Sequence, residues 1–290
     1  MKNYFILLFA FLMVSFVANA QEDDTKEVKK KEKLERAAFE SSYIIDNPTN
    51  VVLSKNALEV QMSHRFGVVN NTGGNDLVGF WAPSNIRIAL AYGIHERLTI
   101  GYGTTKFDRL QDFNWKLSIL RQTRSNSMPV SVSYYGNFTV DARKKDATYN
   151  GGSRFVNLQD RYSNFHQLII AKRFSPKFSA QIAPSVSHYN VVDNTMRNDM
   201  VAIAFGGRYK ISPQTSIMID YSQPITEFMQ DNPHPGISFG LEFSTSAHAF
   251  QLFATNYNGL VSQKNIMFNQ NDIFNGDILI GFNITRIYNF

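Results

Sequence analysis

Residues 276–290 alternate between apolar and polar side chains with a period of two, up to the last residue of the chain. One face carries Ile280, Phe282 and Ile284, and the other carries Gly281 and Asn283. Such alternation marks a β-strand whose two faces meet different surroundings. The stretch is longer than the ~9–11 residues that a tilted strand needs to cross a bilayer. It therefore predicts a membrane-crossing strand, and the alternative is the last edge strand of a soluble sandwich.

Similar alternation recurs from residue 58 onward in about twelve segments, and the connections between them alternate in length. Short turns at one end, long loops at the other and an even strand number are typical of bacterial membrane barrels. The sequence therefore predicts an all-β fold, an antiparallel up-and-down transmembrane β-barrel spanning residues 51–290, with both chain ends in the periplasm. Short turns are expected at residues 94–97, 123–128, 174–177, 211–215 and 244–247, and long loops at 67–84, 104–112, 140–163, 189–199, 224–235 and 257–275.

The composition agrees with strands that have two different faces. Hydrophobic residues make up 43% of the chain and the mean hydropathy is −0.24, which is too polar for a bundle of membrane helices. The chain has no cysteine, so disulfides, thiolate metal sites and a lipid-anchored cysteine are excluded. The net charge of +5 is spread along the chain instead of forming one basic patch, so no nucleic-acid partner is expected.

The N-terminus predicts export. Residues 1–20 contain a basic start, an apolar core and the small-residue sequence Ala18-Asn19-Ala20, which fits a cleaved signal peptide. An uncleaved anchor helix is the alternative, but the apolar run is short. Export, together with alternating strands, predicts the outer membrane as the location.

Residues 21–50 are predicted to form a charged periplasmic segment. Acidic and basic side chains are mixed in its first part, which favours a solvated tail or a short helix over a partner-binding arm. Residues 38–50 carry several apolar side chains and the turn signal Asn47-Pro48. The sequence leaves open whether this piece lines the barrel mouth, enters the lumen or lies outside.

The alternation also predicts which way side chains face. We expect Ile219, Phe239 and Phe282 to face lipid. Residues 164–173 and 249–256 are ambiguous in facing, and a bulge or strand end is expected near Pro184. Seven charged side chains are expected to face the lumen, where both signs can pair and narrow the channel: Glu59, Arg65, Arg87, Lys116, Asp220, Glu242 and Asp277.

Several short motifs carry a family resemblance. The sequence Ser63-His64-Arg65-Phe66-Gly67 and residues 86–93, 97–101 and 120–122 resemble an uncharacterised family of Bacteroidota β-barrel proteins. The resemblance covers residues 38–290. It implies an outer-membrane barrel and no catalytic residues.

No constellation for catalysis or metal binding is evident. Outer-membrane phospholipases pair a His with a Ser two residues later, and none of the six histidines here has a Ser at that spacing. The Asp- and Asn-rich stretches at residues 193–199 and 269–277 do not match an ordered Ca²⁺ loop. We therefore predict no catalytic residue, no metal and no cofactor.

Three functions remain open from the sequence. The first is a narrow channel for small polar solutes or ions. The second is a closed structural or interaction barrel that presents its loops to an unknown protein partner. The third and weaker alternative is a lipid-modifying outer-membrane enzyme. The expected partners in every case are outer-membrane lipid and the barrel-insertion machinery.

The end of the chain resembles the C-terminal insertion signal of bacterial outer-membrane barrels, carried here by Phe282, Ile284, Tyr288 and Phe290. Deleting Phe290, or Phe290→Asp, is expected to lower the amount of protein in the outer membrane, because the terminal aromatic is lost to the insertion machinery. Membrane fractionation with heat-modifiable gel migration measures this. An unchanged level of folded protein would contradict the prediction.

Overall fold

The computed structural model describes residues 32–69, 76–144 and 155–290. The signal peptide predicted at residues 1–20 and the charged residues 21–31 lie outside the described residues. No helix in the described part of the chain is long and apolar enough to cross a membrane.

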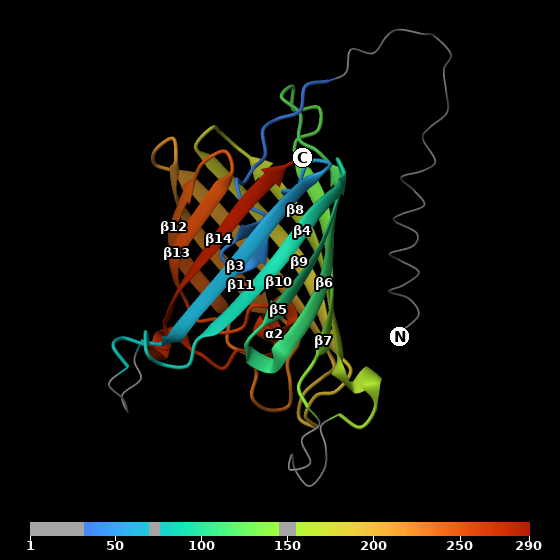
Figure 1. Ribbon diagram of the computed structural model, residues 1–290, viewed down its shortest axis with the longest axis vertical. Helices are drawn as coiled ribbons and strands as arrows, with labels where there is room; N and C mark the ends of the chain where they lie inside the picture. Colours follow the sequence, from blue (N-terminus) through green and yellow to red (C-terminus); the bar gives the residue numbers. More distant parts are fainter. Residues whose placement is uncertain (1–31, 70–75, 145–154) are drawn as a thin grey trace. The chain divides into compact units, whose positions relative to one another are not determined.

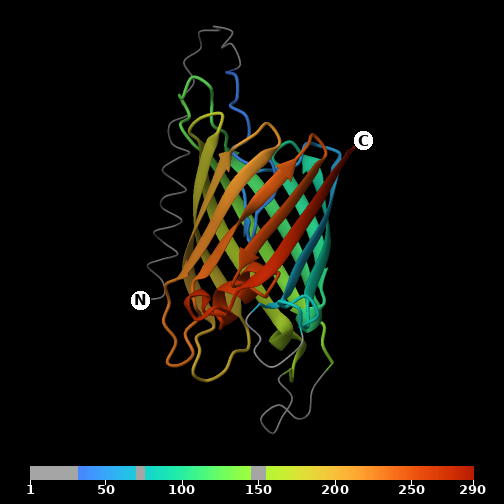
Figure 2. The same cartoon turned by 90° about the vertical axis from the view of Figure 1, so that its left-hand side faces the viewer.

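Twelve strands form one closed antiparallel barrel (Figures 1 and 2). Each strand pairs with its neighbours in the chain, and β14 pairs back onto β3 to close the sheet. This confirms the predicted up-and-down barrel. The strands are β3 Ala57–Val68, β4 Asn85–His95, β5 Leu98–Thr105, β6 Leu110–Leu120, β7 Ser131–Asp141, β8 Tyr162–Arg173, β9 Phe178–Tyr189, β10 Asp199–Lys210, β11 Thr215–Pro224, β12 Gly236–Ser244, β13 His248–Thr255 and β14 Leu279–Asn289.

The two ends of the barrel differ. We call the end that carries the C-terminus the terminal end, and the end with the long connections the loop end. The connection from β5 to β6 is an exception at the loop end. It was expected to be a long loop, but the strands continue to Thr105 and resume at Leu110, so only residues 106–109 connect them. This tight turn requires a left-handed backbone at Asp108 (φ 57°) and Arg109 (φ 47°).

Side chains along the strands alternate between the outer surface and the lumen. Ile219 and Phe239 are 54% and 56% exposed on the outer face, as expected. Their neighbours Asp220 and Gly240 are buried on the inner face. The outer face therefore presents an apolar belt, and the inner face carries the polar side chains.

The stretches that were ambiguous in the sequence have apolar side chains on both faces. Phe165 and Ile169 of β8 are fully buried in the lumen, while Leu168 and Ile170 lie on the outer side. In β13, Phe253 points inward and Leu252 outward. Part of the lumen is therefore apolar, and this obscures the alternation in the sequence.

The bulge expected at Pro184 is absent from the pairing of β9 with both neighbours. Pro184 pairs with Ile203 of β10 in an unbroken register. The ladder between β8 and β9 is interrupted beside Pro184, but its register is the same on both sides of the gap. Because proline has no N–H to donate, it removes a ladder contact without requiring an extra residue.

A short hairpin lies inside the barrel. Its strands are β1 (Tyr43–Ile44) and β2 (Asn47–Pro48), which pair only with each other. The compact unit that contains the barrel begins at Lys33, so the boundary predicted at residue 51 falls within this unit. We call residues 38–50 the plug.

The outer belt predicts a position-dependent cost of inserting charge. Ile219→Arg in the middle of β11 should lower the free energy of unfolding in lipid by ~2–4 kcal/mol, because the charge would face hydrocarbon. Ile211→Arg is a matched control, since Ile211 is also 54% exposed but lies in the turn after β10. It should cost ~0–1 kcal/mol. Equal costs, measured by urea unfolding in lipid vesicles, would contradict the assigned facing.

Candidate functional site

The plug enters the lumen from the terminal end. Before it, Leu34 forms a bridge with Thr123 in the connection between β6 and β7. Ile44 and Ile45 are almost fully buried and pack against Met218 and Phe253 of the wall. Beside Tyr43, the cavity between the plug and the wall measures only ≈ 10 Å³, which is room for about one water molecule. The plug therefore fills the lumen at this level.

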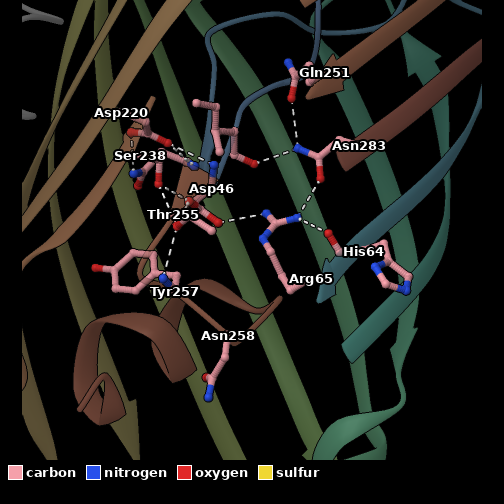
Figure 3. A network of polar contacts seen from close by, with 12 residues as sticks. Asp46, His64, Arg65, Asp220, Ser238, Gln251, Thr255, Tyr257, Asn258 and Asn283 are labelled. Carbon is pink, nitrogen blue, oxygen red and sulfur yellow. Dashed lines mark hydrogen bonds and ion pairs between the residues drawn. The ribbon is translucent and has the colours of Figure 1, made fainter. Parts of the chain in front are cut away.

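The tip of the plug places a carboxylate in the middle of the lumen. Asp46 Oδ1 accepts a hydrogen bond from Arg65 Nη2 at 2.8 Å in a buried ion pair. Its Oδ2 accepts hydrogen bonds from Ser238 Oγ at 2.6 Å and Thr255 Oγ1 at 3.1 Å. Figure 3 shows Asp46 between Arg65 on one side and these two hydroxyl groups on the other. Asp46 thus links β3 to β12 and β13, which lie on the same side of the barrel.

A second carboxylate, from the wall, holds the turn of the plug. Asp220 Oδ2 accepts hydrogen bonds from the backbone N–H groups of Asp46 and Asn47, both at 2.9 Å. Asn47 Nδ2 donates to Asp220 Oδ1 and to Ser222 Oγ, each at 2.8 Å. Burying a carboxylate is costly unless it is hydrogen-bonded, and the plug supplies these donors. Asp220 and the plug therefore depend on each other.

Ser42 of the plug connects two opposite charges of the wall. Lys116 Nζ donates to the Ser42 carbonyl at 2.9 Å, and Ser42 Oγ donates to Glu59 Oε2 at 2.8 Å. Glu59 also accepts from Gln61 Nε2 at 2.6 Å. Both charged side chains are buried. The plug thus occupies the space between two groups that would otherwise face each other across the lumen.

The other predicted lumen charges have different surroundings. Arg87 makes a two-point contact with Asp112, at 2.8 and 2.7 Å, and Arg208 forms an ion pair with Glu242 at 3.0 Å. Asp277 departs from the expectation. It precedes β14 at the loop end, is only half-buried, and accepts a hydrogen bond from the backbone N–H of Asp272 at 3.0 Å.

Sequence reasoning missed the partners of these charges. Asp112 was assigned to a loop, whereas it is an inward residue of β6. Arg208 continues the inward series of β10, so extending the period of two through Gly206 and Gly207 would have found it. The sequence carried no such signal for Asp46, because nothing in the sequence of a turn shows that the turn is buried.

Three residues of the predicted insertion signal, Phe282, Ile284 and Tyr288, lie within β14, and Phe290 follows its last residue. Phe282 stacks on His64 with ring centroids 5.0 Å apart. Ile284 and Tyr288 are partly exposed on the outer face, and Phe290 is 83% exposed beyond the end of the strand.

The loop end of the lumen is filled differently. The helix α2 (Ser262–Phe268) lies there, in the long connection between β13 and β14 (Figure 1). Ile266 and Met267 of α2 pack against inward apolar side chains of β7 to β10, including Phe165 and Met200. Gln263 Nε2 donates to Asn137 and Thr139 at 2.9 Å. The plug and α2 therefore occupy the lumen from opposite ends.

In the described ranges, no group of three or more His, Asp or Glu side chains is arranged to hold a metal ion. The charged groups of the lumen instead neutralise one another or bond to the plug.

Comparison with known proteins places the fold in a family. Residues 39–288 match the model of the membrane bound beta barrel domain, DUF5777. No curated protein sequence matches the chain. The bacterial group expected from residues 63–67 stays a prediction.

Solved structures of low sequence identity resemble the chain. The NanC porin is 7% identical with a TM-score of 0.49, over 80% of this chain and 99% of that one. An outer membrane channel from Pseudomonas putida F1 is 12% identical with a TM-score of 0.47, over 82% and 97%. OmpT, an outer membrane protein of Vibrio cholerae, is 9% identical with a TM-score of 0.39, over 82% and 99%.

The family match covers nearly the whole barrel, and the structure has the closed sheet and apolar outer belt of a membrane barrel. The chain belongs to the DUF5777 family of membrane bound beta barrel domains and is an outer-membrane protein.

Proposed function

We propose that the protein is a narrow, non-enzymatic channel for small polar solutes or ions, which its own N-terminal plug holds closed from the periplasm. The observation that carries the proposal is the set of polar contacts that hold the plug to the wall, beside the apolar contact of Ile44 and Ile45. Asp46, Asn47 and Ser42 bind wall side chains through hydrogen bonds and one ion pair.

A polar contact can be exchanged for water at little net cost. An internal hydrogen bond stabilises a fold by only ~0.5–1.5 kcal/mol, since water offers the same bonds to the separated groups. The wall around the plug includes Gln61, Ser63, Gln251 and Asn283. With the plug withdrawn, these side chains would line a hydrated passage. The width of about twelve strands lies between filled eight-stranded barrels and open sixteen-stranded porins.

The second candidate is a closed barrel that presents its loops to a protein partner. The filling of the loop end by α2 favours it, because Ile266, Met267 and Phe165 make a dry contact that water would not replace easily. An enzyme is the weaker class. His188 contacts Asp199 at 2.7 Å and Asn190 at 3.0 Å, which uses both of its ring nitrogens.

Assembly is part of the same proposal. We keep Phe282, Ile284, Tyr288 and Phe290 as the candidate signal for the barrel-insertion machinery. Their support is the position of the first three on or near the outer face of the last strand, and the exposure of Phe290.

Conductance separates the two candidate functions. In planar bilayers the wild-type protein should show little conductance, and Asp46→Ala/Asn47→Ala should raise the open probability, because Arg65 and Asp220 lose their partners and draw water inward. Glu227→Ala removes an exposed acid at the loop end and serves as the control. Removal of residues 21–50 is a second test of opening. If both plug variants are folded yet remain as silent as the wild type, the channel proposal fails.

The start of the plug should respond to pH. Burial alone would raise the pKa of Glu40, but attraction to Arg208 and the hydrogen bond from Lys210 outweigh it and lower the pKa. The contacts of Glu40 with Arg208 and Lys210, here called the clamp, therefore stabilise the fold fully above the ordinary pKa of glutamate. This stabilisation is lost as the pH falls through the lowered pKa of Glu40. The difference in urea midpoint between wild type and Glu40→Gln should shrink between about pH 7 and about pH 3. A constant difference over this range would contradict the clamp.

A further inference from the structure

A basic cavity lies at the loop end of the barrel. It has a volume of ≈ 740 Å³ and is bordered by the turn between β5 and β6, the end of β7 and the connection that contains α2. Binding pockets for small molecules usually measure about 300–1,000 Å³. We call this cavity the vestibule. Five basic side chains and a single acidic one line it: Lys106, Arg109, Arg143, Lys144 and Lys264, with Asp108.

The acidic side chain positions two of the basic ones. Asp108 contacts Arg143 Nη1 at 2.7 Å and Lys264 Nζ at 3.0 Å. These contacts join the turn after β5 to β7 and to α2. Asp141, which lies outside the lining, also contacts Arg143 Nη2 at 2.6 Å. Two carboxylates cannot balance five cations, so the vestibule keeps a positive potential that favours an anion.

The backbone of the turn is held in a strained shape that presents basic side chains to the vestibule. Asp108 and Arg109 are consecutive non-glycine residues in the left-handed region. Such conformations are unfavourable and persist only where the surrounding structure enforces them, often at binding sites. Here Asn85 Oδ1 accepts from the Phe107 N–H at 3.0 Å, and Asn85 Nδ2 donates to the Asn258 carbonyl at 2.9 Å.

The vestibule lies on the inner side of the wall. Asn85, Thr105 and Leu110 line it and are buried, inward-facing residues of their strands. The buried part of the vestibule wall therefore faces the lumen, whereas Lys106 and Arg109 of the turn are exposed.

A second cavity adjoins the vestibule at the loop end of β3, and the carboxylate of Asp277 lines it. It measures ≈ 420 Å³ and shares Asn85, Phe107 and Asn258 with the vestibule. Arg65 lines it, and Arg65 Nε has no hydrogen-bond partner within the described residues although the side chain is 2% exposed. Figure 3 shows Arg65 between Asp46 of the plug and Asn258 of the loop end. Arg65, which is paired with Asp46, therefore also offers an unused N–H donor to this cavity.

We propose that the vestibule is a binding site for a small soluble organic anion that carries a carboxylate or phosphate group. Lys106, Arg109, Arg143 and Lys264 supply charged donors, and Asn85 and Asn258 hold the walls that carry them. The inference concerns binding and holds whether or not the barrel conducts.

The test uses the full mature chain in nanodiscs and isothermal titration calorimetry with glucose 6-phosphate, glucuronate and, as the neutral counterpart, glucose. The wild type should bind at least one of the two anions, with an affinity that falls as salt is added, and should not bind glucose. Lys106→Gln/Arg109→Gln should weaken anion binding by at least about tenfold, because two charged donors are lost. Lys55→Gln/Lys177→Gln removes the same charge at the terminal end and should bind like the wild type.

Heat-modifiable migration shows whether each variant is folded. Lys264→Gln changes α2 and leaves the strained turn intact, and it should also weaken anion binding. This variant replaces the double variant in the test if the double variant does not fold. The proposal is overturned if the wild type binds both anions no better than glucose, or if folded vestibule variants bind like the wild type. Conductance is not measured in this test, so its outcome is separate from that of the channel proposal.

Discussion

The structure depends on the pairing of its last strand with its first. Inside a bilayer no water is present to bond with exposed backbone N–H and C=O groups, so an open sheet edge is too costly to persist. The pairing of β14 with β3, from Leu279 opposite Val68 to Asn289 opposite Ala57, removes both edges at once. A register shift between Leu279 and Gly281 is accommodated at the loop end of this seam. All other features of the barrel follow from this closure.

Closure creates an inner face whose charged side chains need partners of their own. The sheet uses every strand backbone for its ladder, so charged side chains on the inner face need partners from other side chains or from the plug. Arg87 and Asp112 form such a pair within the wall. Arg65 and Asp220 are paired with the plug, through Asp46 and Asn47. Removing one partner of a buried pair is strongly destabilising while the other stays dry, so Arg65 and Asp220 need water wherever the plug does not contact them.

The lumen has two parts with different chemistry. Around the plug the wall is largely polar, apart from the contact of Ile44 and Ile45 with Met218 and Phe253. Water can take over the contacts of Gln251 and Asn283. Near α2 the inner surface of β7 to β10 is apolar, and its contact with Ile266 and Met267 is dry. The proposed channel would therefore open along the polar side when the plug moves, while α2 stays in place. The basic vestibule lies next to that side, where Asn85 joins it to Arg65.

The sequence by itself determined the barrel, its strand number and most of its facing. The alternation in stretches such as residues 217–222 and 237–243 reports directly on two faces with different surroundings, because each side chain meets either lipid or lumen. It was insufficient where the lumen is apolar, as at Phe165 and Ile169, and where strands ran further than expected, as at Asp112. The position of residues 38–50 was decided only by the tertiary structure. Asp46 meets Arg65 nineteen positions away and Ser238 at a separation of 192. Contacts across a closed lumen join residues that have no local relation in the chain, so no periodicity in the sequence can report them.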